Sequence, residues 1–585
     1  MINFATKVSV TMKVVALALL VLQLPWCIAD AEDKPCKKKY FDGNSSFVCE
    51  CSANYCDTVE RHAELKPDEV IEYSSSKDGD RFTKTILAMD NNTADMSEGA
   101  ELFTVNSSVV YQTILGFGGA FTDSAAMNIL NVSSKVQDHL LRSYFSIQGI
   151  EYNMGRVPIH SCDFSLSEYS YDDYDGDFGL VNFTLVSEDF DLKIPVIKRA
   201  KAMSEWDIRL FASPWSAPAW MKTNGMMHNG FNQGFLIGKP GQKYYKTWAN
   251  YFIRFLKAYD KLNIPMWGLT VQNEPTAGLI PFYSWQCMAM QPPRMRDFIK
   301  MDLGPALHEN GYGHIKLMSH DDNLPGIFED TETVLNDTET KAYTSGIALH
   351  WYQDNWPGAD YDQLDKIIEH YPDQFILATE ACEGYQANAE PVILGSWERG
   401  EAYSYDIIQD LNHFVSGWVD WNIALNMQGG PNWAKNEVDC PIIVDAENDA
   451  FYKQPMFYHM GHFSKFVPAG SVRIGLHSSA NNASQLNSIA FKRPDGTLVT
   501  VLLNRGDSEV PFSMHEATQD GYFNSSVPAR TIKTYLWKMA DPSESFTESS
   551  VTSEHPKVTS DGRRVRSGLA WVLVMAWISA FFSLG

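Results

Sequence analysis

The stretch that decides the fold is Thr270-Val271-Gln272-Asn273-Glu274-Pro275, which continues an apolar run that begins at Ile264. A second acid, Glu380, follows the apolar run Phe375 to Ala378. Both runs are typical of buried strands, so we expect each glutamate at a strand end. In a barrel of parallel strands, the C-terminal strand ends carry the side chains that meet a substrate. Two carboxylates converging there are the groups that cleave glycosidic bonds.

Between about residues 111 and 422, apolar runs rich in strand-forming residues alternate with helical patterns. The separation of Glu274 and Glu380 corresponds to about three strand–helix–strand units of roughly 30 residues or more, which places the acids after strands four and seven of eight. An open doubly wound sheet is the alternative, but Gly116-Phe117-Gly118-Gly119 lacks the last glycine of a phosphate loop. The eight expected strands are 113–120, 152–158, 208–214, 266–273, 315–318, 346–352, 375–380 and 415–422.

The regions that flank this pattern predict a second, all-β domain built from both ends of the chain. Two hairpins are expected, around Asp78-Gly79 and around Pro494-Asp495-Gly496, and residues 531–537 alternate like a last strand.

Several motifs make the chain resemble the glucosylceramidase (acid β-glucosidase) family of retaining glycoside hydrolases from about Cys36 to Lys538. They are Gly116-Phe117-Gly118-Gly119-Ala120, Arg156-Val157-Pro158, Ala212-Ser213-Pro214-Trp215, Lys222-Thr223-Asn224-Gly225, His350-Trp351-Tyr352, Gly429-Gly430-Pro431-Asn432-Trp433 and Phe451-Tyr452-Lys453-Gln454-Pro455-Met456-Phe457-Tyr458. The resemblance implies a (β/α)8 TIM barrel over residues 111–470, with an insertion near 423–455. It also implies a discontinuous β-sandwich over residues 62–110 and 471–540, after a disulfide-bearing β segment at 30–61.

By this resemblance Glu380 is the nucleophile, and Glu274 is the acid and later the base. A physical reason agrees, because the charge of Glu380 raises the pKa of a neighbouring acid that must hold its proton. Arg156 and Tyr352, at the ends of the second and sixth strands, can keep the nucleophile ionised and aimed. The resemblance also implies that Asn273 contacts the sugar 2-hydroxyl.

Sugar recognition needs flat apolar faces and fixed polar groups, which strand ends here supply as tryptophans. The resemblance implies that Asp163, Trp215, Trp421 and Asn436 line a glucose subsite. Core packing is the alternative role for both tryptophans.

Residues 1–29 have the charges and apolar run of a signal peptide. Secretory entry also fits eight glycosylation sequons, at Asn44, Asn91, Asn106, Asn131, Asn182, Asn336, Asn482 and Asn524. Four clustered cysteines follow, Cys36, Cys49, Cys51 and Cys56, and four cysteines allow three disulfide pairings. The resemblance implies Cys36 with Cys49 and Cys51 with Cys56; a zinc knuckle is the rival interpretation. Cys162, Cys287, Cys382 and Cys440 are expected to be free.

The net charge of −25 excludes a nucleic-acid partner. Neither His320-Asp321-Asp322 nor the pair His459 and His462 has the spacing of a zinc enzyme, so no catalytic metal or other cofactor is expected. Residues 541–567 have the composition of a disordered linker. The apolar tail 568–585 departs from the family and predicts either a GPI signal or a short membrane span.

Glu383 is a second departure, because the family has an apolar residue three positions past the nucleophile. We expect its carboxylate to be solvated; the alternative is an inward carboxylate that raises neighbouring pKa values. The resemblance implies hydrolysis of glucosylceramide in sphingolipid breakdown, in a lysosome or at the external cell surface. It also implies two partners, an acidic lipid membrane surface and a saposin-like activator. Two alternatives stay open: another β-glycosidase specificity on the same fold, and a non-catalytic surface protein that binds glycans.

Overall fold

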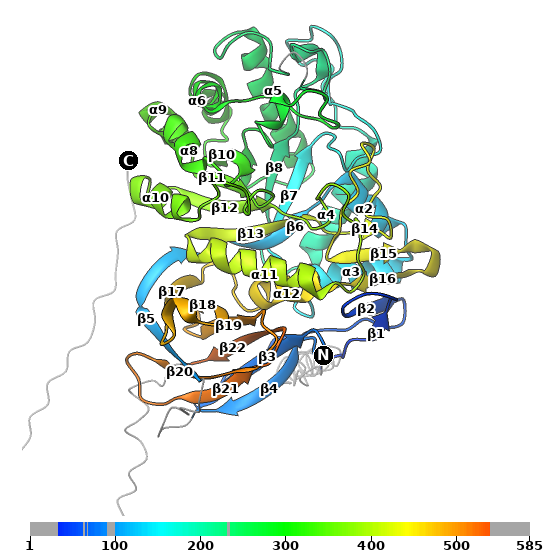
Figure 1. The fold of residues 1–585 in the computed structure, drawn as a ribbon. Helices are drawn as coiled ribbons and strands as arrows, with labels where there is room; N and C mark the ends of the chain where they lie inside the picture. The colour runs from blue at the N-terminus through cyan, green and yellow to red at the C-terminus, as the bar shows by residue number, and fades with distance from the viewer. Residues whose placement is uncertain (1–32, 63–64, 67, 90–99, 231–233, 539–585) are drawn as a thin grey trace, which may run out of the picture. The chain divides into compact units, whose positions relative to one another are not determined.

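The computed structural model describes residues 33–62, 65–66, 68–89, 100–230 and 234–538. Eight parallel strands close into a barrel in the order β6 to β13, so the predicted fold class is confirmed (Figure 1). These strands are β6 (Gly116–Ala120), β7 (Met154–Ile159), β8 (Arg209–Pro214), β9 (Gly268–Thr270), β10 (Lys316–Asn323), β11 (Gly346–His350), β12 (Phe375–Glu380) and β13 (Val415–Asn422).

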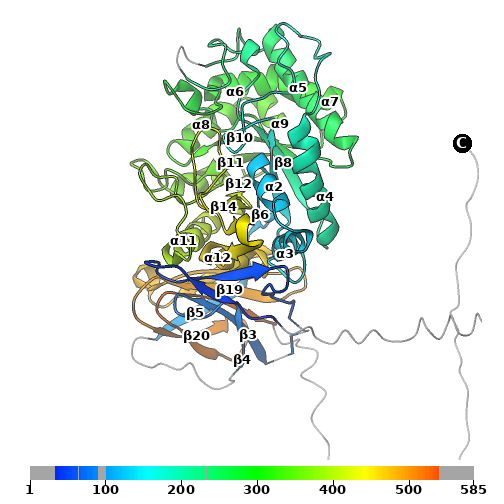
Figure 2. The same ribbon diagram turned by 90° about the vertical axis from the view of Figure 1, so that its right-hand side faces the viewer.

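Helices connect these strands and cover the barrel from outside (Figure 2). They are α2 (Asp123–Leu130), α3 (Ser134–Phe145), α4 (Ile194–Met203), α5 (Lys243–Asp260), α6 (Pro292–Phe298), α7 (Gly304–Glu309), α8 (Ile327–Leu335), α9 (Thr338–Tyr343), α10 (Asp362–His370), α11 (Trp397–Asn412) and α12 (Pro455–Ser464). The longest, α5, buries one aromatic face against the barrel, as an amphipathic surface helix does.

Close backbone contact explains one glycine of the motif in β6. A Cβ atom on Gly118 would lie 2.0 Å from the carbonyl oxygen of Met154 on the neighbouring strand β7, so a larger residue would push the strands apart. Deeper in the barrel a plug of apolar side chains fills the interior. It consists of Met154, Phe211, Met318, Ala348, Leu377 and Val419.

The second domain is a nine-stranded sheet in the order β21-β20-β5-β17-β18-β19-β22-β3-β4. Its strands are β3 (Glu69–Ser76), β4 (Thr83–Ala88), β5 (Glu101–Thr113), β17 (Val472–Ser478), β18 (Leu486–Lys492), β19 (Leu498–Asn504), β20 (Val510–Glu516), β21 (Phe523–Val527) and β22 (Thr531–Trp537). The Phe523 ring on β21 packs against Tyr535 and Trp537 of β22 at 5.4 and 5.3 Å, which shows that the sheet folds over on itself as a sandwich.

Helices α11 and α12 lie between the barrel and this sheet in both views (Figures 1 and 2). His462 of α12 pairs through Nδ1 with the Thr534 hydroxyl at 2.8 Å and through Nε2 with the Ser75 hydroxyl at 2.9 Å. Burial lowers its pKa to about 3, so the ring is neutral and fully engaged. His462, one of the two histidines singled out in the sequence, therefore joins the two domains, whereas His459 pairs with Ser404 of α11.

A third, five-stranded sheet joins the N-terminal segment to the predicted insertion. Its order is β1-β2-β16-β15-β14, where β1 is Lys38–Tyr40, β2 Phe47–Ser52, β14 Leu425–Asn426, β15 Ile442–Asp445 and β16 Ala450–Lys453. Disulfides Cys36–Cys49 and Cys51–Cys56 close this segment, as the resemblance implies.

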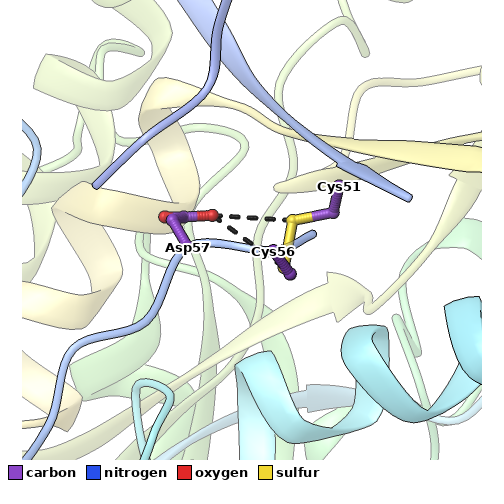
Figure 3. Close-up of side chains that lie close together, drawn as sticks. All are labelled: Cys51, Cys56 and Asp57. Atoms are coloured by element: carbon purple, nitrogen blue, oxygen red, sulfur yellow. Dashed lines mark hydrogen bonds between the residues drawn. A yellow bond between two sulfur atoms is a disulfide. The ribbon is translucent and has the colours of Figure 1, made fainter. Parts of the chain in front are cut away.

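The Cys51–Cys56 pair excludes a zinc knuckle, because both sulfurs are bonded to each other (Figure 3). Asp57 lies beside them with its Oδ1 atom 3.5 Å from the Cys51 sulfur. Its carboxylate is instead engaged by Lys453 Nζ at 2.9 Å and by the Tyr458 hydroxyl at 2.6 Å.

Several predictions from the sequence fall on residues that the structure does not describe: the signal peptide 1–29, the sequon at Asn91, the linker 541–567 and the tail 568–585. In the described part of the chain, no helix is both long and apolar enough to cross a membrane. Of the other sequons, Asn131, Asn182 and Asn336 are exposed, and Asn44, Asn106 and Asn524 are partly exposed. Asn482 lies at a short turn of 3-10 helix (Asn481–Ala483).

Candidate active site

A pocket of about 250 Å³ opens at the C-terminal ends of the barrel strands. Seven of the side chains expected in the site line it: Asp163, Trp215, Glu274, Tyr352, Glu380, Trp421 and, from the insertion, Asn436. Arg156 and Asn273 are not part of its wall and lie behind it. The strand ends thus bring together residues that are far apart in the sequence, as a barrel requires.

Glu380, the last residue of β12, receives one donor on each carboxylate oxygen. Arg156 donates from Nη1 to Oε2, and the Tyr352 hydroxyl donates to Oε1 at 2.8 Å. Arg156 is completely buried, so its charge is not screened by water. Two such donors fix the direction of the carboxylate.

Arg156 also organises the residues around it. Its Nη2 atom donates to Asn273 Oδ1 at 2.7 Å and to Asp321 Oδ2 at 2.9 Å, and its Nε atom donates to the Ser213 hydroxyl at 3.0 Å. Since Arg156 occupies the amide oxygen of Asn273, the orientation of that amide is set by a permanent cation.

Glu274 does not end a strand, which corrects the position expected from the sequence. Strand β9 stops at Thr270, and Glu274 lies in the following loop with a backbone φ of 40°. Its N–H donates to the Asp321 carbonyl at 2.9 Å, which holds this left-handed conformation. Backbone strain of this kind is typical of functional residues.

The two acids face each other across the pocket. One carboxylate oxygen of Glu274, one of Glu380 and one ring nitrogen of His350 all lie within 4.8 Å of one another. Burial raises the pKa of Glu274, and the charge of Glu380 adds to the increase, while His350, whose Nδ1 lies 3.6 Å from Glu274 Oε1, opposes it. The Tyr283 hydroxyl donates to Glu274 Oε2 at 3.1 Å. The environment therefore favours a protonated Glu274.

His350 is a site residue for which the sequence predicts no role, although it belongs to the motif His350-Trp351-Tyr352. Burial alone would lower its pKa, but the charges of Glu380, Asp321 and Glu274 around it raise it to about 10. A protonated imidazole can donate a proton to the carboxylates beside it.

Asp321 is a second site residue for which the sequence predicts no role beyond a rejected metal motif. Its Oδ1 lies 3.2 Å from His350 Nε2, and its Oδ2 accepts a hydrogen bond from Arg156. A bulge between His320 and Asp322, where β10 pairs with β11, aims this carboxylate inward. Although burial opposes ionisation, Arg156 and His350 hold the pKa of Asp321 well below its usual range.

The floor of the pocket is aromatic. The rings of Trp215 and Trp421 stack with centroids 5.1 Å apart, and the Arg156 guanidinium lies 4.8 Å from the Trp215 ring. Their side chains are 2% and 3% exposed, so each is both a core residue and a pocket wall. The two roles weighed for these tryptophans therefore coexist.

Asp163 is buried beside this floor. Its Oδ2 atom accepts from Asn436 Nδ2 at 3.0 Å and from Asn432 Nδ2 at 3.1 Å. Burial raises its pKa to about 7, against these hydrogen bonds and with the help of the Glu380 charge. Asn432 is a partner that no sequence argument had selected.

Glu383 differs from both expectations. Its side chain is only 14% exposed, with Oε2 4.0 Å from Arg399 Nε, so it is not a solvated surface acid. It faces a second pocket beside Trp351 and Tyr405 and is absent from the wall of the catalytic pocket. Arg399 accounts for this placement, because it offers the carboxylate a buried cation away from Glu274 and Glu380.

Comparison with known proteins agrees with this geometry. The TIM-barrel domain of glycosyl hydrolase family 30 matches residues 114–467, and the β-sandwich domain of that family matches residues 470–535. The chain belongs to glycosyl hydrolase family 30. It is therefore a glycoside hydrolase, and within family 30 it groups with the glucosylceramidases, because its 46% identity to the mouse protein named lysosomal acid glucosylceramidase extends over 505 residues. That match covers 86% of this chain and 96% of the mouse protein.

More distant members of family 30 share the architecture. An Aspergillus fumigatus endo-1,6-β-D-glucanase is 27% identical over 442 residues, covering 73% of this chain and 85% of that protein. Among solved structures, SrfJ from Salmonella typhimurium is 30% identical with a TM-score of 0.72, and the match covers 81% of this chain and all of SrfJ.

Proposed function

We propose that the protein is a retaining β-glucosidase that hydrolyses glucosylceramide to glucose and ceramide through a covalent glucosyl-enzyme. The observation that carries this proposal is the approach of Glu274 and Glu380, whose nearest carboxylate oxygens lie within 4.8 Å. Retaining enzymes hold the two carboxyl groups about 5 to 5.5 Å apart, whereas inverting enzymes leave about 6.5 to 9.5 Å for a water molecule.

In the first step Glu380 attacks the anomeric carbon, and the bond from that carbon to the ceramide oxygen breaks. Glu274 transfers its proton to the departing oxygen, so ceramide leaves as a neutral alcohol. Arg156 and Tyr352 orient the carboxylate of Glu380 for attack along the direction set by their hydrogen bonds.

In the second step a water molecule attacks the anomeric carbon and displaces Glu380. Glu274, now a carboxylate, takes a proton from that water. Glu380 carries no charge while it is esterified, so the electrostatic contribution that raised the Glu274 pKa is absent when the residue must act as a base. His350 stabilises this carboxylate through its own positive charge.

Glucosylceramide as substrate is supported by the identity to the mouse glucosylceramidase along nearly its whole length. The alternative of another β-glycosidase specificity is represented by the endo-1,6-β-glucanase relative. Release rates from glucosyl, galactosyl and xylosyl lipids and from a β-1,6-glucan separate these possibilities. We expect the glucosyl lipid to be hydrolysed fastest.

The decisive experiment follows the anomeric configuration of the first glucose released, by proton NMR. A retaining enzyme yields β-glucose before mutarotation, and initial α-glucose would refute the proposal. Glu380→Gln is expected to bind substrate without turnover. A wild-type protein that binds glucosides without hydrolysing them would instead favour a glycan-binding surface protein.

We further propose a secretory protein that works in a lysosome or at the cell surface, on an acidic lipid membrane and with a saposin-like activator. The name of the mouse relative and the two disulfides support the secretory part. Subcellular fractionation and activity on vesicles with and without anionic lipid test it. Release from cells by a phosphatidylinositol-specific phospholipase would identify the tail 568–585 as a GPI signal.

A further inference from the structure

A cluster of three carboxyl groups lies behind the wall that carries Tyr352. Asp354 comes from the loop after β11, and Asp406 and Asp410 lie one turn apart on α11. Asp406 is 4% exposed and Asp410 is 2% exposed. Asp354 and Asp406 line a second pocket of about 160 Å³, which shares Tyr385 with the catalytic pocket.

The contact between Asp354 and Asp406 requires a proton. Asp406 is buried and shares one tyrosine hydroxyl with Asp354, and two ionised carboxylates at such a site would repel each other with no hydrogen between them. The Tyr361 hydroxyl is 3.2 Å from Asp354 Oδ2 and 3.1 Å from Asp406 Oδ1, but it has one hydrogen and can donate to only one of them. At least one of the two acids is therefore neutral.

The hydrogen bonds assign this proton to Asp354. Trp418 Nε1 donates to Asp406 Oδ2 at 2.9 Å, so Asp406 has the donors that an ionised carboxylate needs. Burial raises the pKa of Asp354 to about 11, and the neighbouring charge of Asp406 adds to the increase. The Asp410 carboxyl is also buried, its Oδ1 has no hydrogen-bond partner among the described residues, and burial raises its pKa as well.

No cation neutralises the cluster within the described part of the chain. The Arg505 guanidinium lies 4.3 Å from the Tyr405 ring and forms no ion pair with any of the three acids. The other titratable groups nearby are engaged elsewhere: Glu383 with Arg399, His413 with Asp365 at 3.1 Å, and Tyr385 with the Tyr352 carbonyl at 3.1 Å.

The cluster also connects to the catalytic nucleophile through a short piece of chain. The Asp354 N–H donates to the Trp351 carbonyl at 3.2 Å, and Tyr361 anchors the far end of the segment 351–361. Tyr352, between these anchors, donates to Glu380. The Trp351 ring packs edge-on against Tyr403 and Trp418, so the same wall supports both sites.

We propose that Asp354 is a positioning residue, held as a neutral carboxylic acid that donates to Asp406, and that this contact fixes the segment 351–361 so that Tyr352 meets Glu380. The effect on catalysis rests on the function proposed above, whereas the buried proton can be measured without any activity.

The buried proton makes folding depend on pH in a defined direction. A carboxyl group whose pKa is higher in the folded state contributes stability that is present below its unfolded pKa and is lost as pH rises toward the folded pKa. In Asp406→Asn or Asp354→Asn an amide supplies the hydrogen without a bound proton. From about pH 5 to about pH 8, the Tm of each variant should therefore rise relative to wild type.

Asp373→Asn is the matched control, because Asp373 is exposed and its change removes one negative charge in the same way. Its Tm difference from wild type should stay constant over that pH range. If the Tm difference between each cluster variant and wild type stays constant, as in this control, or decreases with rising pH, the proposed proton does not exist.

A kinetic arm tests the positioning role. Asp354→Leu removes the donor and should lower kcat for a glucoside by roughly tenfold while KM changes less than about twofold. Asp354→Asn should restore kcat. Wild-type kcat in Asp354→Leu would overturn the positioning role, and failure of that variant to fold leaves the pH dependence of the two Asn variants to decide. Absence of glucosidase activity in the wild type would count against the proposed function alone.

Discussion

The Tyr352 hydroxyl donates at 2.8 Å to Oε1 of Glu380, the carboxylate oxygen that Arg156 does not bind. The Glu380 carboxylate is therefore held at both oxygens by side chains from two different parts of the barrel. The sequence predicts both side chains at strand ends, but Arg156 lies within β7, and Tyr352 lies two residues beyond the end of β11. Each contact can be removed separately, which makes the assignment of roles testable.

Tyr352→Phe removes one of these donors and keeps the ring; the hydroxyl also lies 3.5 Å from the Cys382 sulfur, a weaker contact that is lost with it. A hydrogen bond to a charged group contributes about 1.5 to 3 kcal/mol, so kcat/KM should fall by roughly 10- to 150-fold. Tyr312→Phe is the control, since the Tyr312 hydroxyl donates to Asp260 at 2.6 Å and lies outside the catalytic pocket. Equal kinetics for the two variants would contradict the role of Tyr352.

Arg156→Met should destabilise the fold as well as the site. Removing the guanidinium leaves the buried carboxylates of Asp321 and Glu380 without their cation, and breaking a buried pair costs about 3 to 5 kcal/mol. Arg199→Met, which breaks a surface pair with Asp138, should cost about 0 to 1 kcal/mol. Unfolding in urea measures both, and a loss for Arg156→Met no larger than that of the control would argue against this network.

His350→Gln should move the pH profile of kcat/KM. Burial and the Glu380 charge raise the pKa of Glu274, while the nearby positive charge of His350, 3.6 Å away, lowers it. Without that charge Glu274 keeps its proton to higher pH, so the basic limb of the profile should shift to higher pH. A limb that stays in place, or moves to lower pH, would show that His350 does not act on Glu274.

Glu383→Val should leave both limbs of the profile unchanged. Burial raises the pKa of Glu383, but its carboxylate faces Arg399 and the second pocket. Glu383→Gln provides the comparison with the same shape and no charge. A shift of either limb in both variants would mean that the charge of Glu383 reaches the catalytic acids after all.

The barrel could be predicted because each strand is a short apolar run between helical patterns. This pattern is local, so it can be read without knowing which segments are in contact. Glu380 was placed correctly for the same reason: it directly ends such a run. The sequence predicts Glu274 at the end of a strand, but it lies in the loop after β9. The apolar sequence continues past Thr270, whereas the hydrogen-bonded strand ends there.

The remaining features depend on pairings between distant segments. No local pattern predicts that β2, in the disulfide-bearing segment, pairs with β16, in the motif that begins at Phe451. Asp321 became a site residue through a bulge, and a one-residue shift of register reverses the direction of every side chain. The Asp354–Asp406 contact joins a loop to a helix and has no local signature.

The central claim is that Glu380 forms a covalent bond to the sugar. A glucose-like epoxide or fluorosugar should label the purified protein once, and mass spectrometry should place the added mass on the peptide that contains Glu380, with label lost in Glu380→Gln. Label on a different residue, or wild-type turnover by Glu380→Gln, would contradict the account.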